Sequence, residues 1–166
     1  EINELEKLKP NLLNVLGNIK VGDVKRIKAE GKRVLLIDDE ASNGWGTVLR
    51  KILKTSSDED FVIINEKVKD FEAFSEESKR IIEKQKFDLY LVDLRLNGLE
   101  EDENLKTVAF SGMKVLKKIK SLNEGNQVIV FTASNKVWNL KALLDAGADG
   151  YYMKESPEYN FSKTIS

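Results

Sequence analysis

The chain has 166 residues, a length that fits one ordinary domain plus an extension of roughly thirty residues. Hydrophobic residues make up 41% of the sequence and charged residues 33%, the balance of a globular protein with enough apolar material to bury a sheet. The formal net charge is −1, so no overall electrostatic attraction draws this segment to nucleic acid, and we expect no direct nucleic-acid binding.

The sequence contains neither cysteine nor histidine. Their absence excludes disulfides, thiolate nucleophiles, the usual zinc sites and hydrolases that use an imidazole base. Carboxylates, lysines and hydroxyl groups are left for any chemistry. No apolar stretch has the length of a membrane span and no signal peptide is visible, so we expect a cytoplasmic protein that does not bind membranes.

Residues 1–30 are predicted to form an N-terminal helical extension, interrupted at Pro10. Its apolar residues lie near the a and d spacing of a coiled coil: Ile2, Leu5, Leu12, Leu16 and Ile19. Lys9 and Asp23 break that seam. Two interpretations stay open: an amphipathic helix docked on the neighbouring domain, and a coil that forms a homodimer.

From Lys32 onward, short apolar runs alternate with segments of helical periodicity. Five runs are rich in β-branched, leucine or aromatic residues, as strands buried on both faces should be: Val34–Ile37, Phe61–Ile64, Leu89–Val92, 128–131 and 151–153. Apolar residues at helical spacing predict four helices between these runs: 48–53, 71–82, 113–119 and 140–144. Gly147 suits the C-terminal end of the last helix.

This alternation predicts right-handed βαβ units, and therefore an α/β domain over residues 31–166 with a five-stranded parallel sheet and helices on both faces. Ligands bind such sheets outside the carboxyl ends of the strands. One long irregular stretch, 97–110, is acidic at positions 100–103 and too long for an ordinary connection, so we expect it to be functional or mobile.

Acidic residues follow the first and third predicted strands. Asp38 and Asp39 come directly after the first strand and Asp93 after the third, so three carboxylates converge on one edge of the sheet. Clustered carboxylates repel one another unless a cation shares them, and a set of hard oxygen ligands suits Mg²⁺. The alternative interpretation is that Asp38 to Asn43 cap the following helix and that Asp93 only starts a loop.

Two more polar residues, Thr132 and Lys154, end the fourth and fifth predicted strands at the same edge. Beside three carboxylates and a metal ion they form a site for a dianionic phosphoryl group, because the lysine and Mg²⁺ neutralise its oxygens and the hydroxyl donates a hydrogen bond. A carboxylate that the metal does not fully consume can act as a nucleophile and form an aspartyl phosphate. Taken singly, Lys154 also fits a solvated strand end and Thr132 a helix cap.

Four segments resemble the motif strands of the response-regulator receiver family: VLLIDDE, FDLYLVDLRL, QVIVFTAS and GADGYYMKE. The resemblance covers about residues 32–157 and implies the flavodoxin-like, doubly wound receiver fold. It implies that Asp93 accepts the phosphoryl group. Asp39 and Asp93 would ligate Mg²⁺ directly, together with the backbone carbonyl of Arg95. Asp38 would act partly through water.

The same resemblance implies that Thr132 and Lys154 hold the phosphoryl oxygens and that Tyr151 changes position on activation. It implies a phosphoprotein of two-component, phosphorelay signal transduction. A sensor histidine kinase or a phosphotransfer protein would supply the phosphoryl group, and an output domain or partner protein outside this segment would receive the signal. Such a domain phosphorylates and dephosphorylates itself and is not a conventional enzyme.

The chain departs from the family pattern in three places. One is the last helix, which could begin at Pro157 but has only Phe161 and Ile165 for its apolar face, so we expect it to be truncated. Asn97 and the acidic insertion precede Gly112 where the family has a short turn containing proline, and the proline that follows the family lysine is displaced to Pro157. A degenerate receiver that only binds other proteins is therefore the main alternative. An aspartyl phosphatase is less well supported, because Arg95 occupies the place of its general acid. We expect the Arg95 side chain to lie at the mouth of the site and to hinder the hydrolytic water.

Overall fold

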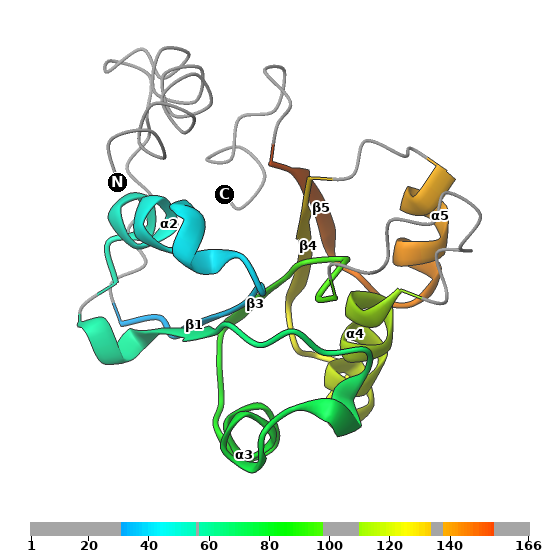
Figure 1. The fold of residues 1–166 in the computed structure, drawn as a ribbon, viewed down its shortest axis with the longest axis horizontal. Coiled ribbons are helices and arrows are strands. Elements are labelled where there is room, and N and C mark those ends of the chain that lie inside the picture. The colour runs from blue at the N-terminus through cyan, green and yellow to red at the C-terminus, as the bar shows by residue number, and fades with distance from the viewer. Residues whose placement is uncertain (1–30, 56, 98–109, 134–137, 155–166) are drawn as a thin grey trace.

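The computed structural model describes residues 31–55, 57–97, 110–133 and 138–154, and Figure 1 shows their arrangement. Five parallel strands form one sheet in the order β2-β1-β3-β4-β5. The strands are β1 (Val34–Ile37), β2 (Phe61–Ile64), β3 (Leu89–Val92), β4 (Val128–Thr132) and β5 (Gly150–Met153). All five predicted strands are confirmed. β4 extends one residue further than predicted, to Thr132, and β5 begins one residue earlier, at Gly150, because the parallel ladder continues through these residues.

Within the part of the chain that the structure describes, four α-helices accompany the strands: α2 (Trp45–Leu53), α3 (Glu76–Lys84), α4 (Ser111–Leu122) and α5 (Trp138–Asp145). Three short 3₁₀ helices accompany them: η1 (Ala41–Asn43), η2 (Asp58–Asp60) and η3 (Phe71–Ala73). Among the described residues, no helix is long and apolar enough to cross a membrane.

The helix predicted over 71–82 is two elements, η3 and α3. The Asp70 carboxylate accepts a hydrogen bond from the Ala73 N–H, and the Ser75 hydroxyl accepts one from the Ser78 N–H. Each side chain caps a separate helical segment. The prediction of a single helix over 71–82 is therefore wrong, although the apolar residues of this region do face the core.

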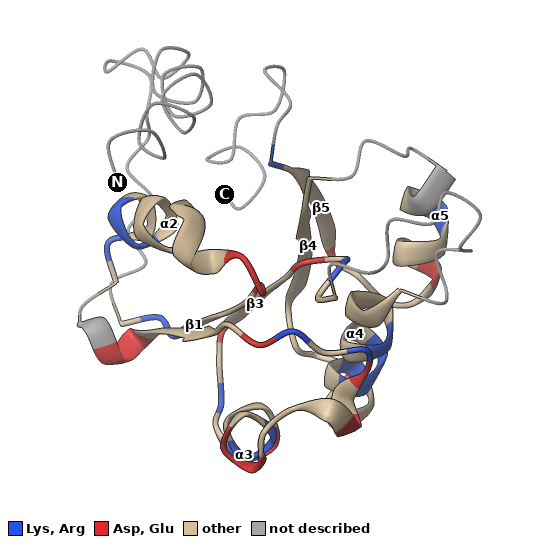
Figure 2. Ribbon diagram, viewed as in Figure 1, with Lys and Arg blue, Asp and Glu red and all other residues tan. Residues whose placement is uncertain are grey.

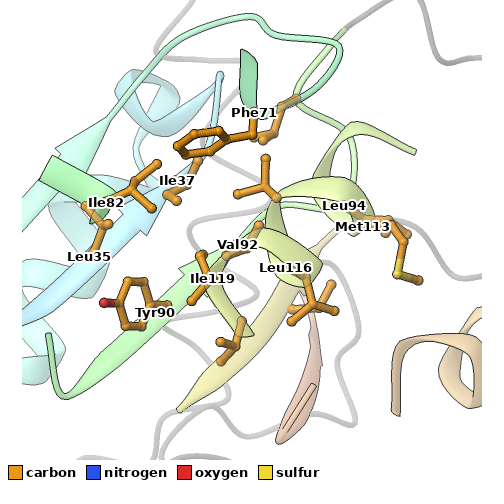
Figure 3. Close-up of a cluster of buried hydrophobic side chains, with 14 of the residues drawn as sticks. Leu35, Ile37, Phe71, Ile82, Tyr90, Val92, Leu94, Met113, Leu116 and Ile119 are labelled. Atoms are coloured by element: carbon orange, nitrogen blue, oxygen red, sulfur yellow. The ribbon is translucent and has the colours of Figure 1, made fainter. Parts of the chain in front are cut away.

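Side chains that alternate along the strands divide the core into two layers. One layer packs under α3, α4 and α5 (Figure 3) and includes Leu35, Ile37, Ile82, Val92, Leu116, Val130 and Leu143. The other layer packs under α2 and includes Leu36, Leu49, Leu53, Leu91, Phe131 and Tyr152. The prediction of helices on both faces of a parallel sheet is confirmed (Figure 1).

Gly147 terminates α5 as predicted. Its φ of 96° lies in the left-handed region, which glycine adopts without strain. The Gly147 N–H donates to the Leu144 carbonyl at 2.9 Å, and the Ala148 N–H donates to the Leu143 carbonyl at 3.0 Å. These two bonds form a Schellman motif and turn the chain back toward β5.

The residues that follow the insertion are bonded to the segment between β3 and the insertion. The Leu96 N–H donates to the Ser111 hydroxyl at 2.7 Å, and the Gly112 N–H donates to the Leu94 carbonyl at 3.0 Å. A Cβ atom on Gly112 would lie 1.9 Å from the Asp93 carbonyl oxygen. The first turn of α4 is therefore pressed against the end of β3.

Some predictions fall on residues that the structure does not describe. The N-terminal extension and its helical or dimerising character belong to residues 1–30, and the acidic part of the insertion belongs to residues 98–109. The division of the chain at residue 30 stays a prediction.

We predict that Gly112→Ala lowers the free energy of unfolding by about 3 kcal/mol or more, because the added methyl group overlaps backbone atoms that cannot move independently. Chemical denaturation measures the loss. Gly125→Ala is the matched control, since its Cβ would meet only the Asn123 side chain, at 3.2 Å. Equal stability of the two variants would contradict the close approach of α4 to β3.

Candidate functional site

Polar residues from four strands meet at one end of the sheet. Because the strands are parallel, their carboxyl ends share one edge. Asp38 follows β1, Asp93 follows β3, Thr132 ends β4 and Lys154 follows β5. Figure 2 shows the acidic segments after β1 and β3 side by side near the start of α2. The predicted convergence at the strand ends is present in the fold.

A buried lysine joins the first and last strands of this site. The Lys154 Nζ donates to Asp38 Oδ2 at 2.7 Å and lies 3.6 Å from Asp93 Oδ1. The exposed fraction is 7% for Lys154, 0% for Asp38 and 8% for Asp93, so water screens these charges little. The alternative interpretation of Lys154 as a solvated strand-end lysine is therefore wrong.

Three carboxylates form a compact oxygen cluster. One oxygen each of Asp38, Asp39 and Asp93 lies within 4.8 Å of the others. Asp93 Oδ1 is buried without a hydrogen-bond partner. One ammonium cannot neutralise three carboxylates, and oxygen ligands at this spacing suit a hard divalent cation. The site therefore fits a cation of the Mg²⁺ or Ca²⁺ type.

Capping does not account for these acidic residues. Asp38 Oδ1 accepts a hydrogen bond from the Glu40 N–H at 2.9 Å, which shapes the turn after β1. The residue before α2 is Gly44, and no side chain caps that helix. Asp38 thus uses one carboxylate oxygen for the turn and the other for Lys154.

Burial controls the ionisation of two carboxylates of the cluster, those of Asp93 and Asp39. Burial is the largest cause that raises the pKa of Asp93, to about 7; Lys154 and a hydrogen bond with Thr132 oppose this rise, whereas Asp38 and Asp39 add to it. Burial followed by the charges of Asp38 and Glu40 also raises the pKa of Asp39. The folded protein therefore holds these carboxylates with difficulty as anions unless a further cation is present.

Thr132 and Tyr151 belong to the layer under α3, α4 and α5. Thr132 is buried and its hydroxyl donates to Asp93, so it reaches the acidic cluster from the end of β4. Tyr151 is half-buried, packs against that layer and pairs with Val130 in the sheet. The alternation of side chains places Thr132 on the same face as Val130 and hence as Tyr151.

Arg95 lies against Phe110, the last residue of the irregular stretch 97–110. Its guanidinium carbon is 5.2 Å from the centroid of the Phe110 ring, and its Nε is buried without a hydrogen-bond partner. The described contact is with an aromatic ring and not with a carboxylate. Its backbone carbonyl as a metal ligand stays a prediction.

Two residues near the site escaped the sequence analysis. Lys67 lies in the loop after β2, and its charge lowers the pKa of Asp39 against the larger effect of burial. Phe131 precedes Thr132, and its ring centroid is 5.3 Å from Lys154 Nζ. Nothing in the sequence around Lys67 marks it. The alternation of side chains along the fourth strand could have placed Phe131 on the same face of the sheet as Lys154.

We predict that Asp93→Asn stabilises the cation-free protein, increasingly as the pH rises. The folded state keeps the Asp93 proton up to about pH 7, whereas the unfolded state loses it near the ordinary value of 3.8. The wild-type free energy of unfolding therefore falls as the pH rises between these values, by an amount on the order of 4 kcal/mol that the variant does not lose.

Denaturation in EDTA between about pH 5 and about pH 8 measures this difference. Asp88→Asn is the control of opposite sign, because the Arg33 N–H and Lys32 lower the pKa of Asp88. That variant should lose stability at neutral pH. A difference between wild type and Asp93→Asn that does not grow with pH would contradict the buried, poorly compensated carboxylate.

Comparison with known proteins identifies the family. The family model described as the response regulator receiver domain matches residues 34–166. A search of the curated proteins gives no match. Many solved structures resemble the chain, and the three below are each at most 24% identical to it, so they support the fold alone.

One is a response regulator from Burkholderia pseudomallei with a phosphorylated aspartic acid, calcium ion and citrate, at 20% identity and a TM-score of 0.54. The match covers 75% of this chain and only 61% of that protein. A CheY-like receiver domain protein from Methanospirillum hungatei JF-1 matches at 24% identity and a TM-score of 0.52, with 76% and 84% covered.

The receiver domain of the Francisella response regulator 1452 matches at 20% identity and a TM-score of 0.52, covering 76% of this chain and 88% of that one. The sheet order and the strand-end cluster agree with the family match over most of the sequence. This chain belongs to the response regulator receiver domain family.

Proposed function

We propose that this chain is a phospho-accepting receiver in which Asp93 takes a phosphoryl group in a Mg²⁺-dependent reaction and switches the protein surface. The observation that carries the proposal is the cluster of Asp38, Asp39 and Asp93 oxygens within 4.8 Å of one another, beside the buried Lys154 ammonium. This set supplies a nucleophile, ligands for a cation and a group that binds phosphoryl oxygens.

Asp93 is the nucleophile in this proposal. One of its carboxylate oxygens bonds to phosphorus while the bond from phosphorus to the donor breaks, and the leaving group keeps that electron pair. Asp93 Oδ1 makes no hydrogen bond in the structure, so no existing bond hinders its attack. The reaction is a self-modification, and the domain is a signalling module and not a conventional enzyme.

Asp39 and Asp93, with the Arg95 carbonyl, would hold the cation directly, and Asp38 partly through water. When bound, Mg²⁺ neutralises charge on the phosphoryl oxygens. The Burkholderia structure contains both a phosphorylated aspartic acid and a calcium ion, which supports a divalent cation in the proposed reaction.

Lys154 and Thr132 provide the remaining contacts. Lys154 pairs with Asp38 and approaches Asp93, so a small movement of its ammonium brings it to a phosphoryl oxygen on Asp93. The Thr132 hydroxyl already donates to Asp93 and can transfer that hydrogen bond to the phosphoryl group. Charge-assisted hydrogen bonds of this kind are stronger than neutral ones.

The partners follow from the family. A sensor histidine kinase or a phosphotransfer protein would donate the phosphoryl group, and an output domain or partner protein would read the switched surface. We place this exchange in the cytoplasm, where such kinases present their phosphoryl groups.

We predict that acetyl phosphate with Mg²⁺ adds one phosphoryl group to Asp93, as intact mass spectrometry will show. Asp93→Asn and excess EDTA should each abolish the adduct, because the first removes the nucleophile and the second the cation. Asp88→Asn is the matched control at the opposite end of β3, where Asp88 pairs with Lys32. An adduct that survives Asp93→Asn would overturn the proposal, and a wild type without an adduct would favour a receiver that only binds proteins.

We also predict that phosphorylation is read out through Thr132 and Tyr151. A new dianion on Asp93 draws the Thr132 hydroxyl inward, and the Tyr151 ring takes the vacated space. The phosphoryl group can shift this equilibrium only through its unequal contacts with the two states. NMR with the phosphoryl mimic beryllofluoride should shift the signals of Tyr151 and of residues 135–145.

Thr132→Ala should remove these distant shifts, and Thr132→Ser should keep them because it retains the hydroxyl. Shifts confined to the neighbourhood of Asp93 in the wild type would rule out this switch.

A further inference from the structure

An aromatic ring forms a third contact of the Lys154 ammonium. Lys154 Nζ lies over the Phe131 ring, 5.3 Å from its centroid, in addition to its contacts with Asp38 and Asp93. Phe131 is fully buried. The face of an aromatic ring carries negative potential and attracts an ammonium, most strongly where water is excluded.

Two further aromatic side chains fix the orientation of that ring. Tyr152 stacks on Phe131 at 5.1 Å with an angle of 10° between the rings. Trp45 meets Phe131 edge to face at 4.9 Å and 84°. Both arrangements are favourable for aromatic pairs. Phe131 therefore has little freedom to turn away from the lysine.

The sheet places these groups together. Phe131 pairs with Tyr152 across β4 and β5, and Lys154 follows two residues after Tyr152, so all three side chains leave the sheet on the face covered by α2. Trp45 is the first residue of α2. The aromatic group thus connects the acceptor site to the start of that helix.

We propose that Phe131 is a positioning residue for the phosphoryl-binding ammonium of Lys154, and that Trp45 and Tyr152 hold its ring in place. The inference rests on the proposed function, because it assigns Phe131 a role through Lys154. A carboxylate of Asp38 or Asp93 that a cation or a phosphoryl group engages attracts the ammonium less. The ring face is not altered by either event, so it keeps the ammonium at the site.

A fluorination series at position 131 separates this electrostatic role from packing. Phenylalanine with one, two or three ring fluorines has nearly the same shape but a progressively weaker negative face. We expect the affinity for beryllofluoride, in saturating Mg²⁺, to fall stepwise by about threefold to tenfold over the series. Phe131→Leu, which removes the ring, should lose at least as much.

A second readout does not depend on phosphoryl chemistry. In the wild type without ligands, NMR should show the Lys154 ε-methylene protons shifted upfield by the ring current of Phe131. Phe131→Leu should return them to ordinary positions. The unfolding temperature of each protein confirms that the fluorinated variants are folded.

Phe87 supplies the matched control. It is a buried ring with the Arg33 guanidinium carbon 4.7 Å from its centroid, before β3 and so at the opposite end of the sheet. The same fluorines at position 87 weaken a comparable interaction but should leave beryllofluoride affinity unchanged.

The outcomes are distinguishable. A wild type that binds no beryllofluoride would overturn the proposed function and this inference with it. A wild type that binds it, with equal affinity across a folded fluorination series at position 131, would overturn the inference alone. Lys154 protons at ordinary positions in the wild type would also overturn it.

Discussion

A shortage of positive charge in a buried site organises this domain. Asp38 and Asp93 are almost completely buried and share one ammonium, that of Lys154, while Asp39 lies at the edge of the cluster. Removing one partner of a buried ion pair leaves an uncompensated charge, which destabilises more than the pair stabilises. The arrangement therefore persists because the sheet fixes the positions of these side chains. Binding of a cation, or protonation of a carboxylate, reduces the repulsion between the carboxylates.

The sheet also places the phosphoryl-binding lysine and the proposed switch residue Tyr151 on opposite faces. Neighbouring residues of a strand face opposite layers, so β4 sends Phe131 toward the lysine under α2 and Thr132 toward the layer that holds Tyr151. Thr132 ends its strand, where its hydroxyl still reaches Asp93. A charge added at Asp93 is thereby in contact with both layers. No long chain of contacts is needed to carry the effect from one face to the other.

Much of the fold was predictable because strands buried on both faces are unbroken apolar runs in the sequence. For three of the five strands, both predicted ends agree with the structure. The break between η3 and α3 was missed, since the apolar period continues through it and only the capping bonds of Asp70 and Ser75 reveal it. The site residues were found from strand ends. Lys67 escaped because its effect on Asp39 arises from a loop without any motif.

The insertion can differ in length from other receivers without disturbing the acceptor, because the chain is fixed on both sides of it. Leu96 is bonded to Ser111 through its N–H and to Val68 through its carbonyl, at 2.7 Å each. The end of β3 is thus held by two separate segments next to the point where the insertion begins. Closing a longer loop costs only about 0.6 kcal/mol for each doubling of its length. The position of Asp93 therefore depends on these bonds and on Gly112, and only weakly on how many residues lie between them.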